Sequence, residues 1–267
     1  MVHFKLLKHV VLASTAAFVL AGTAIAAPVS SYGNIAAPGV YYGSGNVNGN
    51  WTIGTNTTNN VEVALRAKDR GTGATIDGSS GIYSTFQGLC NPVCSGGPKA
   101  RWNYDFSINT RAGGGTLDLT NVIVVLGVDT NSSAATTFTF LNVLSNWGDS
   151  DYWSGTERSG STGAPVAGEY GVQQSANPLF GNAGFGGVLP GAGLYDFTLT
   201  VFARNAAGGQ GEILAQVGTQ VQVGQSRRAW RWPGWHSSAW LQWAGVVAAD
   251  ASTLTGDDPA AAGFFLV

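Results

Sequence analysis

RWNYDFSINTRAGGGTLDLTNVIVVLGVD, residues 101–129, is the stretch that predicts how this chain folds. In its first part large apolar side chains stand at every second position and polar ones between them, which is the period of a half-buried β-strand. We expect the polar residues of this strand to face solvent. The four residues that we expect to be buried are Trp102, Tyr104, Phe106 and Ile108.

The second part of the stretch predicts a partner for this strand. Three consecutive glycines at 113–115 can adopt the positive φ angles of a tight reversal, and residues 122–126 are then apolar without interruption. An apolar strand needs cover on both faces, so we expect a hairpin at the centre of two packed sheets.

The rest of the body alternates in the same way and predicts a single antiparallel, jelly-roll-like β-sandwich with Gly-rich turns. In residues 61–68 we expect Glu62, Arg66 and Lys68 to point outward, where charges discourage pairing with another sheet edge. The other expected strands are edge strands at 40–42 and 51–53, a short strand at 82–86, a strand at 136–143, and a closing hairpin of 194–203 with 212–223.

The N-terminus has the pattern of a secretory signal peptide. Lys5 and Lys8 precede an apolar run at 10–22 and the small-residue pattern at 24–26. We expect cleavage after Ala26 and a secreted or cell-surface protein. The alternative, a membrane anchor, is disfavoured because the run is shorter than the roughly 20 residues of a spanning helix. The expected division is a signal peptide at 1–26, a β-sandwich at 27–226 and an irregular tail at 227–267.

Composition narrows the partners of the chain. Only 10% of the residues are charged and the net charge is −2, with no basic stripe, so we expect no binding to nucleic acid. We expect contact with a membrane only through the signal peptide, unless a sorting tail is restored in frame. Aromatic residues are plentiful enough to close a core.

The two cysteines of the chain, Cys90 and Cys94, lie in LCNPVCSGG and predict a local disulfide, because an exported chain meets oxidising conditions. A metal or redox role is disfavoured, since the spacing is not Cys-x-x-Cys and no histidine occurs between Val10 and Trp235.

Candidate ligand-binding residues gather in a long polar and aromatic excursion after residue 143. Aromatic rings there could stack on a sugar, and two carboxylates could serve a glycoside hydrolase, although solvated loop aspartates are the plainer interpretation. These residues are Trp147, Asp149, Asp151, Tyr152 and Trp153.

Calcium is the one cofactor that the sequence suggests. Asp129 with Asn131, and Asp149 with Asp151, are pairs of oxygen donors at alternate positions, the donor type that a hard cation prefers. Neither pair forms an EF-hand loop.

The remaining charges predict structure rather than chemistry. Arg66, Asp105 and Arg101 could pair across neighbouring strands. A catalytic nucleophile needs a base to take its proton. The only histidine after the predicted cleavage site is His236, which lies in the tail. We therefore expect no catalytic site and no enzyme.

Several of these segments together resemble a known class. GVYYGSGNVNGNWTI, VEVALRAK, RWNYDFSIN, and YDFTLTVFA followed by ILAQVGTQVQVG resemble exported bacterial proteins of the PEP-CTERM sorting class, over residues 34–224. The resemblance implies a β-rich surface or matrix protein, with a C-terminal Pro-Glu-Pro motif, apolar helix and arginine cluster that an exosortase recognises.

The tail departs from that class. QSRRAWRWPGWHSSAWLQWAGVV holds five of the nine tryptophans and has neither strand nor helix period. With common GC-rich codons and a shifted frame, residues 224–248 can be re-read as PEPASLALAGLALLGLAAVGRRRR. We therefore interpret the tail as a frameshifted sorting signal.

The leading hypothesis is a non-enzymatic exported surface or extracellular-matrix protein, associated with exopolysaccharide, a biofilm or other surface proteins. The alternatives are a calcium-assisted carbohydrate-binding module and, less favoured, a glycoside hydrolase.

Overall fold

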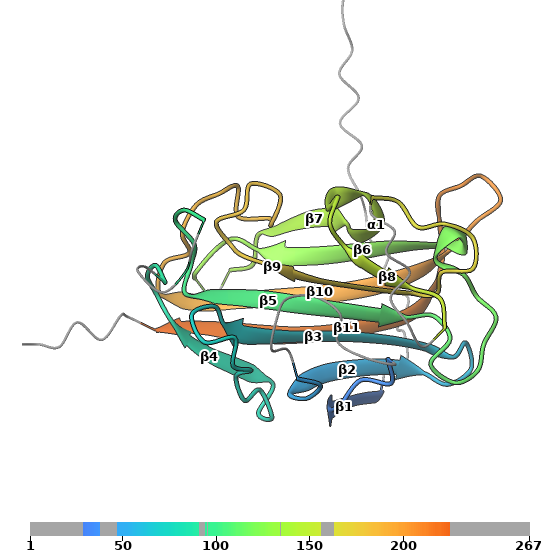
Figure 1. Ribbon diagram of the computed structural model, residues 1–267, viewed down its shortest axis with the longest axis horizontal. Helices are drawn as coiled ribbons and strands as arrows, with labels where there is room; N and C mark the ends of the chain where they lie inside the picture. Colours follow the sequence, from blue (N-terminus) through green and yellow to red (C-terminus); the bar gives the residue numbers. More distant parts are fainter. Residues whose placement is uncertain are drawn as a thin grey trace, which may run out of the picture. The chain divides into compact units, whose positions relative to one another are not determined.

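Two β-sheets packed face to face form the body of the protein (Figure 1). The computed structural model describes residues 29–37, 47–90, 94, 96–133, 135–155 and 163–224. The predicted signal peptide, the predicted tail and the strand expected at 40–42 lie outside these residues. Within the described part, no helix has both the length and the apolar character needed to cross a membrane.

Sheet A has six strands in the order β1-β2-β3-β5-β9-β8. Its strands are β1 (Val29–Gly33), β2 (Trp51–Asn56), β3 (Val61–Asp69), β5 (Trp102–Asn109), β9 (Gly171–Ala176) and β8 (Asp151–Trp153). β2 was expected at an edge, but β1 pairs along its outer side. β8 lies inside the predicted excursion, which ends at Tyr170, and β9 begins directly after it, so part of that segment is sheet rather than loop.

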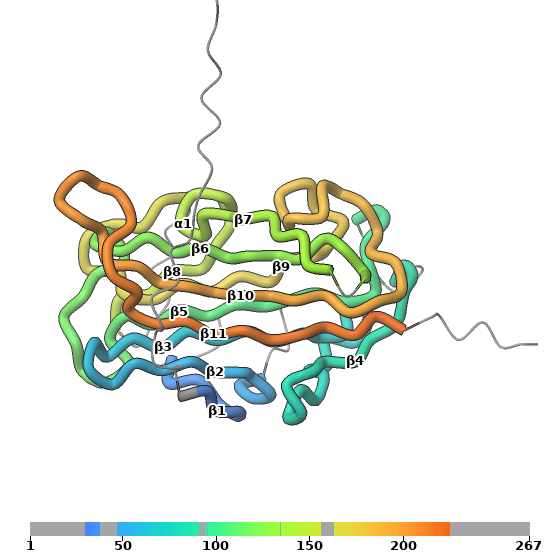
Figure 2. The backbone as a smooth tube through the Cα atoms, turned by 180° about the vertical axis from the view of Figure 1, so that it is seen from behind, coloured from blue at the N-terminus to red at the C-terminus, as the bar shows by residue number. Residues whose placement is uncertain are grey.

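Sheet B has five strands in the order β4-β11-β10-β6-β7. They are β4 (Ile82–Phe86), β11 (Gln210–Gly224), β10 (Gly193–Arg204), β6 (Val122–Asp129) and β7 (Phe138–Asn142), with η1 (Leu119–Asn121) before β6 and α1 (Val143–Asn146) after β7. The predicted closing hairpin is confirmed as β10–β11, whose two paired strands run along the length of the sheet (Figure 2).

One strand pair departs from the antiparallel prediction. β4 pairs with β11 in parallel. The chain enters β4 from β3 and leaves it toward β5, both in sheet A. No hairpin therefore fixes its direction, and parallel pairing through a long connection is allowed.

The predicted central hairpin is wrong, because β5 and β6 belong to opposite sheets. The glycines at 113–115 do not reverse the chain onto β5. Instead this turn packs against Asn60 of the β2–β3 turn, whose carbonyl accepts the Ala112 N–H at 2.9 Å, and a Cβ at Gly113 would overlap the Asn60 amide. β6 is also covered on one face only, since Ile123 and Val125 remain partly exposed.

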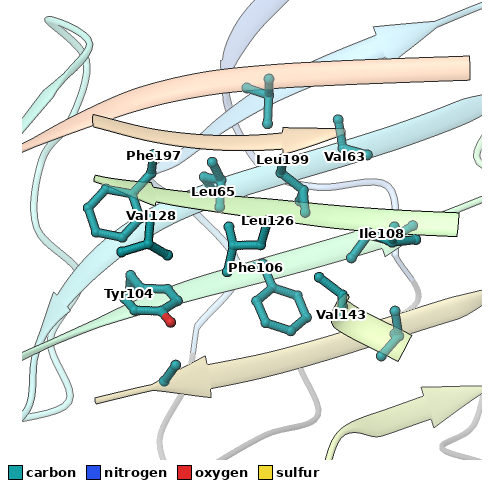
Figure 3. Close-up of a cluster of buried hydrophobic side chains, with 14 of the residues drawn as sticks. Val63, Leu65, Tyr104, Phe106, Ile108, Leu126, Val128, Val143, Phe197 and Leu199 are labelled. Carbon is teal, nitrogen blue, oxygen red and sulfur yellow. The ribbon is translucent and has the colours of Figure 1, made fainter. Parts of the chain in front are cut away.

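The core lies between the sheets and contains the predicted residues of β5 (Figure 3). Tyr104 and Phe106 point toward Val128 and Leu126 of β6 and toward Phe197 of β10. All four predicted residues of β5 are at most 1% exposed, which confirms that this strand is central to a sandwich.

The opposite face of β5 contradicts the sequence prediction. Asn103, Asp105, Ser107 and Asn109 were expected in solvent, yet none exceeds 3% exposure. A strand flanked by β3 and β9 on both sides keeps its polar side chains among those of its neighbours.

Candidate binding site

The face of sheet A that is turned away from sheet B is named here the outer face. Strand alternation places on it the polar residues of β5 together with those opposite them on β3 and β9. Arg66 and Ser175 stand directly across from Asp105 on either side.

An ion-pair network lies at the centre of the outer face. Arg66 Nε donates to Asp105 Oδ2 at 2.9 Å, and Lys68 Nζ lies 3.6 Å from Asp105 Oδ1. The side chains of Arg66 and Asp105 are fully buried. Burial lowers the pKa of the Lys68 ammonium, and the negative charge of Asp105 opposes that shift. The predicted pairing of Arg66 with Asp105 is therefore confirmed, but as a buried pair. Arg101 instead lies 3.5 Å from Asp69 in an exposed pair.

The segment 47–50 crosses the outer face and is held there by Arg66. The Nη1 of Arg66 donates to the carbonyls of Val47 and Gly49, both at 2.8 Å. The guanidinium carbon of Arg66 lies 4.1 Å from the centre of the Trp51 ring. This arginine thus uses its fork of donors and its flat face at the same time. The network is well suited to fixing a loop on the sheet.

A hollow of about 210 Å³ lies at the end of the outer face, between the β2–β3 turn and the turn that follows β5. Both turns lie at the same end of sheet A (Figure 1). The lining residues are Ala36, Thr55, Asn56, Thr57, Asn60, Val61, Glu62, Ala112 and Gly113.

Glu62 is the charged residue of this hollow and is 5% exposed. It stands opposite Thr55 on β2 and opposite Asn109 on β5. Its Oε1 accepts the Ala36 N–H at 2.8 Å, whereas its Oε2 has no partner among the residues that the structure describes. Burial raises the pKa of the Glu62 carboxyl, and the Ala36 N–H partly opposes that rise.

The three predicted aromatic ligand residues do not lie together in the fold. Trp147 and Tyr152 belong to the core between the sheets, where Trp147 packs 5.3 Å from Phe106. Trp153 lies on the outer face in a second apolar cluster, together with Trp51. All three predicted aromatic side chains are at most 3% exposed, so they do not form an open stacking surface.

The two predicted carboxylates face different ways. Asp151 stands opposite Gln173 on the outer face and is buried. Asp149 is exposed, and its Oδ1 accepts a hydrogen bond from Gln174 Nε2 at 2.8 Å. Gln174 itself stands opposite Phe106 on the inner face. A pair of glycosidase carboxylates must instead approach one bond from two sides of a shared site.

The calcium donors are also separated. Asp129 ends β6 in sheet B, while Asp151 begins β8 in sheet A. Asp129 Oδ1 accepts the N–H groups of Asn131 and Thr137, at 3.0 and 2.8 Å, and Asn131 Oδ1 accepts the Ser133 N–H at 3.0 Å. Across the described ranges, no three His, Cys, Asp or Glu side chains gather where they could hold a metal. The four predicted donors therefore do not form one site.

The predicted disulfide between Cys90 and Cys94 is confirmed. Its loop is followed by Ala100, whose N–H and carbonyl both bond to the side chain of buried Asn177, at 2.9 and 3.0 Å. The bridge thus constrains the chain just before β5 begins.

Sequence reasoning missed the Glu62 hollow. The signal available was Glu62 itself, the one acidic residue among the three charges at 61–68 for which the alternation predicts an outward position. Comparison with known proteins adds no second signal, because the sequence matches no protein-family model and no curated protein significantly.

Proposed function

We propose that this chain is a non-enzymatic exported protein of the PEP-CTERM class, acting at the cell surface or in an extracellular matrix in association with exopolysaccharide. The observation that carries the proposal is the Cys90–Cys94 disulfide within a β-sandwich. Disulfides persist in secreted and periplasmic proteins and are rare where thiols are kept reduced. The predicted signal peptide at 1–26 agrees with that compartment.

The charged groups of the sheet support a structural rather than a catalytic assignment. Asp105 is held by Arg66 and Lys68, and Asp129 closes the loop that follows β6. Carboxylates in such contacts stabilise the fold by satisfying buried donors. The proposal assigns these residues to the scaffold that presents the protein outside the cell.

Cell fractionation tests the proposal. The full-length chain, expressed from residue 1 in a Gram-negative host, should leave the cytoplasm, begin at Ala27 by mass spectrometry, and carry no thiol that reacts with a maleimide. A chain lacking 1–26 is the control and should remain in the cytoplasm. Retention of the full-length chain inside the cell, with Met1 intact and both thiols reactive, would overturn the proposal.

A carbohydrate-binding role is the second candidate, and the Glu62 hollow is the observation that favours it. Trp153→Ala is a poor test of that role, because Trp153 is fully buried and its loss would unsettle the sheet. The hollow offers a cleaner one.

A further inference from the structure

The Glu62 hollow has the features of a built site rather than of a surface dent. Its one acidic residue, Glu62, is 5% exposed, one carboxylate oxygen accepts the Ala36 N–H at 2.8 Å, and the other lacks a partner within the described chain. A buried charge is costly unless it is paired. A ligand that supplied a positive charge to Oε2 would remove that cost.

The charges around the hollow leave Glu62 uncompensated. Arg66 lies four residues after Glu62 on β3 and on the same face, but its guanidinium group pairs with Asp105. Arg111, in the turn after β5, pairs with Asp118. The groups that face Glu62 from β2, β5 and the segment before β2 are Thr55, Asn109 and the Ala36 N–H, all of them neutral.

The lining is mostly apolar, but four of its side chains can bind hydroxyl groups. Thr55, Thr57 and the amides of Asn56 and Asn60 border the hollow. Asn56 uses its Oδ1 on the N–H groups of Thr58 and Asn59, at 3.0 and 3.2 Å, which orients its remaining amide group. Hydroxyl and amide side chains both donate and accept hydrogen bonds, as the ring hydroxyls of a sugar require.

Size restricts the ligand further. The hollow has about 210 Å³, several times the roughly 30 Å³ that a water molecule occupies in the liquid and less than the ~300 Å³ at which drug-sized pockets begin. One six-membered sugar ring is of this order.

We propose that the hollow binds a hydroxylated primary amine, namely a single amino-sugar unit whose ammonium group pairs with Glu62. The ammonium donates to Oε2, and ring hydroxyls bond to the threonines and asparagines of the β2–β3 turn. This inference deepens the proposed association with exopolysaccharide. It rests on that proposal only where it names the polymer as the source of the amino sugar. A free amino sugar and a terminal amino-sugar unit share the same chemistry.

The test is calorimetric titration of the full chain at pH 7 with D-glucosamine, D-glucose and N-acetylglucosamine. These probes differ at one ring position, so the comparison isolates the ammonium. Glucosamine should bind at least tenfold more tightly than either neutral sugar. Equal affinity for the three sugars, or binding of none, would overturn the proposal.

Variants locate the binding. Glu62→Gln, which keeps an acceptor for the Ala36 N–H, should abolish the preference for glucosamine. Glu212→Gln, at an exposed position on β11, should leave it unchanged. If the first variant fails to fold, the wild-type protein provides the same test at pH 4, where a protonated Glu62 should no longer prefer the amine. A preference that persists in Glu62→Gln or at pH 4 would assign the binding elsewhere.

The source of the amine is resolved by a partially deacetylated glucosamine polymer, which should compete with glucosamine if chain ends reach the hollow. A fully acetylated polymer is the control. Fractionation reports on export alone, so failure of the sugar titration and failure of export are separate outcomes.

Discussion

Arg66 of β3 and Asp105 of β5 form an ion pair of 2.9 Å with both side chains fully buried on the outer face of sheet A. The pair joins two central strands and, through Arg66, ties segment 47–50 to the sheet. Breaking a buried pair by removing one partner leaves a charge in a poorly solvated place, which typically costs about 3–5 kcal/mol.

Asp105→Ala should therefore lower the free energy of unfolding by about 3–5 kcal/mol, because Arg66 and Lys68 lose their shared counter-charge. Urea denaturation followed by tryptophan fluorescence measures this loss. Arg101→Ala is the control, since its pair with Asp69 is half exposed and should contribute less than about 1 kcal/mol. Equal losses in the two variants would contradict the central role of Asp105.

Trp153 lies directly over Gly171, its partner across the β8–β9 pair, and a Cβ at Gly171 would overlap the indole ring. Because Trp153 is fully buried, it has no free space to move into. Gly171→Ala should destabilise the protein by about 1–3 kcal/mol, the usual cost of overpacking.

Thermal unfolding measures this effect, and Gly218→Ala is its matched control. Gly218 is exposed on β11, and an added Cβ would make only an ordinary contact at 3.6 Å with the Phe197 carbonyl. This variant should melt within a degree or two of the wild type. A Gly171→Ala protein as stable as the control would show that Trp153 is not confined.

Asp129 is expected to act as a loop acceptor. Asp129→Ala removes the acceptor of the Asn131 and Thr137 N–H groups and should cost about 1–3 kcal/mol. That cost should be the same with and without millimolar calcium. A calcium-dependent rise in the melting temperature of the wild type that disappears in Asp129→Ala would instead support the metal site suggested by the sequence.

The strand alternation predicted the inward side of the fold well, because burying large apolar side chains dominates the choice of face. Trp102 and Phe106 lie where the pattern places them. The same alternation placed Asp105 wrongly in solvent. A polar residue at an alternate position of a strand points away from the core, where it can be either solvated or buried in an ion pair. Which one occurs depends on the residue that the register places opposite, here Arg66.

Pairing between distant segments explains the other failures. β9 has the sequence GVQQSA, with few strand-forming residues, and it becomes a strand because β5 lies alongside it. The Glu62 hollow depends on the β2–β3 turn meeting the turn after β5, through the bond from Ala112 to Asn60. No local pattern encodes that meeting, whereas the Cys90–Cys94 bridge, formed within one loop, was predictable.

Glu62 should also leave a signature in the pH dependence of stability. Burial raises the pKa of its carboxyl in the folded protein above the value of about 4.3 expected in the unfolded chain. Between these two values the folded state holds more protons, so the contribution of Glu62 is fully present below pH 4.3 and is lost as pH rises through the folded pKa.

Glu62→Gln cannot ionise, so its stability relative to the wild type should increase from pH 4 to pH 7. Urea midpoints of the two proteins at pH 4, 5.5 and 7, without any sugar, measure the difference, and other titrating groups cancel because both proteins share them. Glu212→Gln, which changes an exposed carboxyl, should follow the wild type throughout. Parallel curves for Glu62→Gln and the wild type would mean that the Glu62 carboxylate is well solvated in the folded protein. The hollow would then have no unpaired charge to offer a cationic ligand.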